Sequence, residues 1–154
     1  MKTFKRITLL LLAAVLAFSL AASCFAGDTA LTRQEAAEML VQAADDYHRG
    51  VKTEDILKGY PDGNLDLSGT LTRAQALMML DRAFGGLPAP VGDSARTAAG
   101  MQGFSDAPAW GGEELSRVLS SGIVAGEADG LLHPDAPVTR EDLQTLISRV
   151  YALE

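Results

Sequence analysis

Apolar residues recur every three to four positions in two stretches of the chain, and both stretches begin just after a Thr-Arg pair. The first stretch carries Leu77, Leu80 and Phe84, and the second carries Leu143, Ile147 and Val150. This spacing places each set on one face of an α-helix, where it can pack against a protein core. The pattern therefore predicts two amphipathic helices whose apolar faces are buried.

Threonine marks the start of three predicted helices. The motifs are Thr32-x-x-Glu35, Thr72-x-x-Gln75 and Thr139-x-x-Asp142, and the apolar residues just before them are Leu31, Leu71 and Val138. In such a capping box the hydroxyl accepts from a first-turn amide, and the acid or amide side chain returns the bond. We expect helices over residues 32–47, over 72–84 and from 139 nearly to residue 154. A short helical piece is expected at 53–58, and another helix after residue 106 that Gly122 ends.

The chain contains an internal repeat. Adding 67 to the residue numbers of the stretch 59–82 reproduces its pattern of glycine, aspartate, apolar and Thr-Arg positions at 126–149. A partial third copy lies 40 residues before the first of these, around Leu31-Thr32-Arg33. One such copy is too small to bury its apolar stripe alone, so the copies are expected to pack together.

Each copy has an arginine in the first helical turn, at Arg33, Arg73 and Arg140. The positive end of the helix dipole mildly favours acids there. Free first-turn amides together with a guanidinium would suit a carboxylate or phosphate, so the recurrence suggests an anionic ligand. The alternative is that each arginine is a solvated side chain paired with a nearby acid.

These motifs resemble the S-layer homology family, whose modules run from F-x-D…W through a G-x-x-G-Y-x-D-G loop to I-T-R-A-E and a helix. The third copy follows the pattern almost throughout, with Phe104-Ser-Asp106, Trp110, Gly126, Asp129-Gly130 and Val138-Thr139-Arg140-Glu141. The second copy keeps Gly59 to Gly63 and the Thr-Arg pair, but it lacks the opening segment. The first keeps little beyond residues 31–35 and its helix.

The resemblance implies a groove for cell-wall carbohydrate, often a pyruvylated sugar, to which the opening aspartate, the tryptophan and the Thr-Arg arginine contribute. By position these are Asp106, Trp110 and Arg140, with Gly126 in the same motif, and by motif match also Arg73 and Arg33. Trp110 can equally be a packing residue. Because the third copy alone has the near-complete pattern, Arg140→Ala is expected to be the most damaging of the three arginine changes.

The N-terminal segment has the three-part layout of a secretory signal: a basic start, an apolar run over 7–20 and small residues over 21–26. Cleavage after Ala26 competes with lipidation of Cys24, which would provide a membrane anchor. Removal of residues 1–26 takes three of the 13 basic residues and none of the 20 acidic ones, which leaves a net charge of −10. This acidity argues against nucleic acid or an anionic membrane surface as a partner.

Other site chemistry has little support. Cys24 is the only cysteine, so neither an intramolecular disulfide nor a cysteine zinc site is expected. Asp62-x-Asn64-x-Asp66 has the oxygen spacing that opens a calcium loop, but Leu67 replaces its turn glycine, which favours a tight turn. His48 and His133 lie in unrelated parts of the repeat, without a recurring nucleophile or carboxylate pair. We therefore expect no metal, no cofactor and no catalytic residue.

The sequence thus predicts a mainly α-helical protein, in which S-layer-homology-like copies form a roughly threefold bundle. The expected division is a signal at 1–26 and one domain at 27–154, with copies at 28–50, 51–85 and 104–154 and a linker at 86–103. The expected function is non-covalent binding of an anionic secondary cell-wall polysaccharide by a secreted, wall-associated protein. The alternative is an extracellular protein-interaction or assembly module that has lost sugar binding and has an envelope protein as its partner.

Overall fold

The computed structural model describes residues 29–46, 50–87, 100–124 and 128–152. The signal at 1–26 with Cys24, most of the linker, His48 and Gly126 lie outside the described residues. In the described ranges the chain forms five α-helices and two 3-10 helices, with no sheet. These are α2 (Arg33–Asp46), α3 (Thr53–Ile56), α4 (Arg73–Phe84), η1 (Gly100–Gly103), η2 (Ala109–Gly111), α6 (Gly112–Ser120) and α7 (Arg140–Tyr151). The mainly helical prediction is confirmed.

The predicted helix starts are also confirmed. The Thr72 hydroxyl oxygen accepts a hydrogen bond from the Gln75 amide, and the Thr72 amide donates one to the side-chain oxygen of Gln75. The same reciprocal pair joins Thr139 to Asp142, and Thr32 to Glu35. These caps satisfy backbone donors that a helix end otherwise leaves without a partner. The sequence therefore determines locally where α2, α4 and α7 begin.

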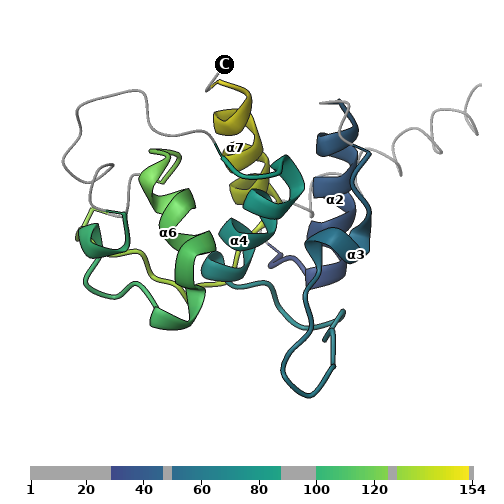
Figure 1. Cartoon of the computed structure of the whole chain (residues 1–154), viewed down its shortest axis with the longest axis horizontal. Coiled ribbons are helices and arrows are strands. Elements are labelled where there is room, and N and C mark those ends of the chain that lie inside the picture. Colours follow the sequence, from purple (N-terminus) through teal and green to yellow (C-terminus); the bar gives the residue numbers. More distant parts are fainter. Residues whose placement is uncertain (1–28, 47–49, 88–99, 125–127, 153–154) are drawn as a thin grey trace, which may run out of the picture.

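Helix α4 lies between α6 on one side and α2 with α3 on the other, and α2 also contacts α7 (Figure 1). The core between these helices is almost entirely aliphatic. Its largest fully buried side chains are Leu40, Ile56, Leu71, Leu77, Met79, Leu80, Leu115, Leu119, Leu132 and Leu143. The loop after α3 projects away from the helices in Figure 1. None of the helices in the described part of the chain is both long and apolar enough to cross a membrane.

The three segments that precede the capped helices meet in a closed ring of backbone hydrogen bonds. The Leu31 amide donates to Val138 O at 2.8 Å, the Val138 amide to Leu71 O at 3.1 Å, and the Leu71 amide to Leu31 O at 2.8 Å. All three side chains are buried. The apolar residue before each threonine thus joins the copies to one another.

The 67-residue repeat extends to the backbone of the loops. Gly63 and Gly130 have φ values of 81° and 80°, and Asp66 and His133 both adopt the left-handed region, with φ of 46° and 53°. A non-glycine residue seldom has positive φ, so its occurrence at two positions separated by the repeat offset indicates the same turn. The two loops therefore share these two turn positions despite different side chains.

Candidate functional site

Arg33, the first of the recurring arginines, is a buried residue, with 6% of its surface exposed. Its Nε donates to Leu65 O at 3.0 Å and its Nη2 to Lys58 O at 3.0 Å. The guanidinium carbon lies 5.1 Å from the centre of the Tyr60 ring, within cation–π range. Arg33 at the start of α2 therefore holds the loop of the following copy.

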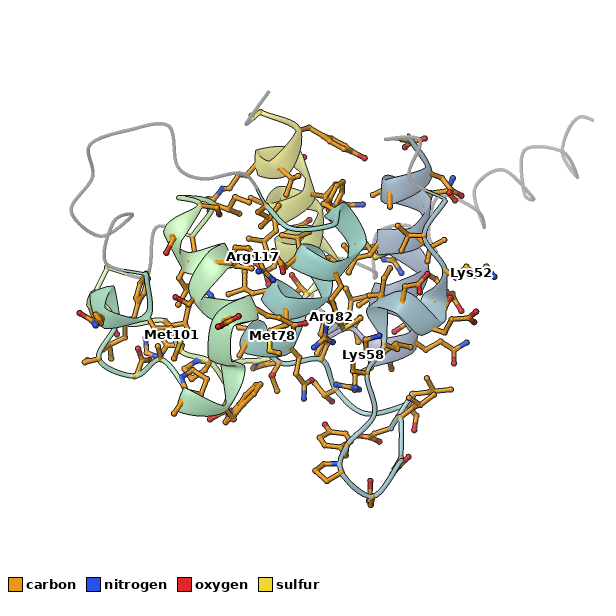
Figure 2. The ribbon with its side chains drawn as sticks, viewed as in Figure 1. Lys52, Lys58, Met78, Arg82, Met101 and Arg117 are labelled. Carbon is orange, nitrogen blue, oxygen red and sulfur yellow. The ribbon has the colours of Figure 1, made fainter. Side chains whose placement is uncertain are left out.

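Beside Arg33 is a hollow of about 310 Å³, which we call the Arg33 hollow. Its lining residues are Arg33, Lys58, Gly59, Tyr60, Pro61, Gln75, Met78, Met79, Arg82 and Trp110. Figure 2 shows Met78, Arg82 and Lys58 close to one another beside α4. Three cations and no carboxylate line it, although the chain as a whole is acidic. Such a surface suits an anionic ligand.

Trp110 is the residue by which the third copy contributes to this hollow. It lies in η2, just before α6, and 60% of its surface is exposed, so this tryptophan is not a core residue. Tyr60 is also exposed and lines the same hollow. Exposed aromatic rings beside polar groups are suited to contact with a sugar face. The Arg33 hollow therefore combines cations with aromatic surface.

Arg82 is a residue of this hollow that the motifs did not mark as functional. Its Nε donates to Glu114 Oε1 at 3.1 Å, its Nη2 forms an ion pair with the same carboxylate, and its Nη1 donates to Ile56 O at 3.1 Å. At the repeat offset, Arg149 donates to Ile123 O at 2.8 Å. The sequence signal that could have marked this residue is the recurrence of arginine at positions 82 and 149. The contacts show that its role is structural, since Arg82 of α4 also binds Glu114 of α6.

Asp106 binds the backbone of the loop in its own copy. Its Oδ1 accepts from the Leu132 amide and its Oδ2 from the His133 amide, both at 2.8 Å. Burial raises the pKa of the Asp106 carboxyl, but hydrogen bonds from the Leu132 and His133 amides and from its own amide, together with the charge of His133, outweigh this and lower the pKa below its usual value. Asp106 thereby ties the opening segment, which carries Trp110, to the following loop.

The Asp106 contacts lead to a prediction about pH. A folded-state pKa below the unfolded one adds stability at pH values above about 4, and this is lost as pH falls through the folded pKa. We expect Asp106→Asn to lower the free energy of unfolding by about 1–2 kcal/mol at pH 7 and by clearly less at pH 3. Urea denaturation at both pH values measures this, with the exposed Asp135→Asn as control. An equal loss at both pH values would contradict the ionic role of the carboxylate.

Arg140 lines a different hollow, formed with the side of α2. Its Nη1 donates to Met39 Sδ at 3.2 Å, and Glu35, Glu38 and Asp46 are among the other lining residues. Hydrogen bonds from the Thr32 amide and hydroxyl lower the pKa of Glu35, which keeps this carboxylate charged. The structure therefore does not bring Arg140 and Trp110 into one groove, and acids surround Arg140.

Arg73 lines a third hollow, with Asp129 and His133 of the later loop. His133 Nε2 lies 2.7 Å from Asp129 Oδ2. Hydrogen bonds from the Leu131 amide and then from His133 lower the pKa of Asp129. The cation in this hollow thus shares it with a carboxylate, in contrast to the Arg33 hollow.

Free first-turn amides, which the sequence argument assumed for anion binding, are not found on α2 and α4. The amides of Arg33 and Gln34 donate to Gly69 O and Leu67 O, each at 3.0 Å. Those of Arg73 and Ala74 donate to Ala136 O and Pro134 O, each at 2.9 Å. The loop of the next copy satisfies these donors, so the assumption is wrong for both helices and an anion would have to be bound by side chains.

In the loop with calcium-like spacing, the side-chain oxygens are used within the turn. Asp62 Oδ1 accepts from the Asn64 amide at 2.9 Å, and Asn64 Oδ1 accepts from the Asp66 amide at 3.0 Å. The tight-turn interpretation is the one that the geometry supports. Within the described ranges no group of three or more histidine, cysteine or acidic side chains is arranged to hold a metal ion.

Comparison with known proteins agrees with a binding module. The S-layer homology domain profile matches residues 103–143. Over 91 residues the chain is 29% identical to "Cell surface glycoprotein 1" of Acetivibrio thermocellus. That alignment covers 59% of this chain but 4% of the relative, so the chain spans a small fraction of that protein. No solved structure matches the chain.

The class that the family match indicates is that of a binding module. More specifically, the chain carries an S-layer homology domain at residues 103–143, and it is distantly homologous to a cell surface glycoprotein. Domains of this family are non-catalytic modules that attach proteins to the cell envelope. The resemblance seen in the third copy is thereby confirmed, whereas the status of the first two copies stays a prediction.

Proposed function

We propose that this protein binds an anionic cell-wall polysaccharide non-covalently and resides at the cell surface, as the name of its distant relative also suggests. The observation that carries the proposal is the Arg33 hollow, where Arg33, Lys58 and Arg82 meet the exposed Trp110 with no carboxylate in the lining. A sugar ring stacked on Trp110 would place an acidic substituent within the field of these cations.

The hollow lies between copies, which explains why the degenerate second copy still matters. Lys58 and Tyr60 come from its loop, Arg33 comes from the first copy, and Trp110 comes from the third. A complete F-x-D…W opening within each copy is therefore not needed for a complete hollow. Of the residues expected to bind ligand, we propose Arg33 and Trp110 as contacts or close neighbours of the polysaccharide, and Asp106 as a residue that positions Trp110.

Sedimentation with purified cell walls tests the proposal. We expect the protein to sediment with intact walls and to remain in solution when the acidic polymer has been extracted. Trp110→Ala should weaken binding to the polymer about tenfold, because a stacking face worth roughly 0.5–1.5 kcal/mol beyond its buried area is lost. Its melting temperature should change little, since the ring is exposed. Equal sedimentation with extracted walls would reject the proposal.

A protein-interaction role is the second candidate, and it is favoured by the projecting loop after α3. Leu65 and Leu67 are both exposed on this loop. Exposed leucines on a protruding segment can provide a contact for another protein. Crosslinking on the cell surface, followed by recovery of a stable protein partner in the absence of wall binding, would favour this role over polysaccharide binding.

A further inference from the structure

Two of the three cations in the Arg33 hollow are already engaged by the protein. Arg33 is buried, and its Nε donates to Leu65 O while its Nη2 donates to Lys58 O. Arg82 is neutralised by Glu114, and its Nη1 is bound to Ile56 O. A ligand anion that took these guanidinium groups would have to compete with hydrogen bonds that hold the fold. Both arginines therefore serve mainly as positioning residues.

Lys58 differs from the two arginines. Its residue is exposed, and within the described ranges its ammonium makes no ion pair or hydrogen bond, while its carbonyl is fixed by Arg33. An ammonium group carries three donors on a flexible stem, so it can follow a charged substituent of a bound sugar. The backbone of this lysine is thus held in place while its charge remains available.

The repeat shows that this lysine belongs to the Arg33 hollow alone. The position 67 residues later is Ala125 in the sequence, and the hollow beside Arg73 is lined by Asp129 and His133. The hollow beside Arg140 is lined by three acids. Among the described hollows that contain a Thr-Arg arginine, only the Arg33 hollow combines an uncommitted cation with an absence of lining carboxylates.

We propose that Lys58 is the specificity-determining residue of this site and pairs with the carboxylate or phosphate of a sugar that stacks on Trp110. This inference rests on the proposed polysaccharide binding, and it assigns the choice of an acidic over a neutral sugar to one side chain. The motif arginine Arg33 shapes the site by holding the loop to which Lys58 belongs.

The test compares wild type, Lys58→Gln and Lys58→Arg for binding to polysaccharide released from purified walls. Lys52→Gln is the matched control, because Lys52 is also exposed, lies just before α3 and does not line the hollow (Figure 2). We expect Lys58→Gln to weaken binding roughly ten- to a hundredfold, Lys58→Arg to retain most of it, and Lys52→Gln to bind as wild type. Circular dichroism melts should be the same for all four proteins.

The same proteins are then measured on polymer whose carboxyl groups have been reduced to alcohols, and on polymer treated with a phosphatase. One of the two treatments removes the group that Lys58 recognises. That treatment should weaken wild-type binding to the level at which Lys58→Gln binds untreated polymer. It should not weaken the binding of Lys58→Gln any further. If wild type does not bind the untreated polymer, the proposed function has failed. If wild type and Trp110→Ala behave as expected but Lys58→Gln matches Lys52→Gln, only the role of Lys58 is wrong.

Discussion

Leu71→Ala is expected to lower the free energy of unfolding by about 2–5 kcal/mol, the usual range for a fully buried leucine cut back to alanine. Leu71 has no exposed surface, and its backbone takes part in the ring of hydrogen bonds with Leu31 and Val138. Loss of its side chain leaves a cavity where the three copies meet. Urea denaturation followed by circular dichroism measures the effect.

Leu67→Ala is the matched control for this change. Leu67 is 40% exposed on the projecting loop, and the atom that bonds to Gln34 is its carbonyl oxygen, which the substitution keeps. We expect a change within about 0.5 kcal/mol for this variant. Similar losses for the two leucines would show that the junction of the copies is not a centre of stability.

Arg33→Ala is expected to lower the free energy of unfolding by about 2–4 kcal/mol, because a buried, charged side chain loses its two hydrogen bonds to the carbonyl oxygens of Leu65 and Lys58. The loop that lines the Arg33 hollow would then be less ordered, so binding to wall polysaccharide should fall as well. Thermal melts and binding isotherms measured on one preparation separate the two effects.

Arg140→Ala is the comparison for Arg33→Ala. In the described part of the chain its side chain donates a weak hydrogen bond to the Met39 sulfur, and three acids line the same hollow. We expect a stability loss below about 1 kcal/mol and little loss of binding. The sequence motif instead predicts that Arg140→Ala weakens binding the most of the three arginine changes. Stronger loss of binding in Arg140→Ala than in Arg33→Ala would support that prediction and reject the Arg33 hollow as the main site.

The local parts of this fold were predictable from the sequence. Thr32, Thr72 and Thr139 begin their helices as expected, because a capping box is complete within four residues. The repeat offset likewise predicted matching turns, and Gly63 and Gly130 have nearly the same φ. Both signals depend on residues that are close in the chain or are copied at a fixed distance.

The site could not be predicted to the same extent, because it depends on how the copies close on one another. The motif joined Trp110 to Arg140 within one copy, whereas the structure places Trp110 with Arg33 and with the loop of the middle copy. The role of Arg33 in holding Lys58 was equally hidden, since its contact is a side chain to a backbone carbonyl 25 residues away. The spacing of residues along the chain does not predict such a contact.

The ring that joins Leu31, Leu71 and Val138 also affects how the protein can acquire its structure. In an open array each repeat touches only its neighbours, so folding can begin at one end and spread. Here the first and last copies are in direct contact, and the Tyr151 hydroxyl donates to Ala43 O, 108 residues away. The N-terminal copy lacks this partner until the C-terminal helix is available. The contacts that close the ring are therefore non-local, and contacts of this kind slow folding.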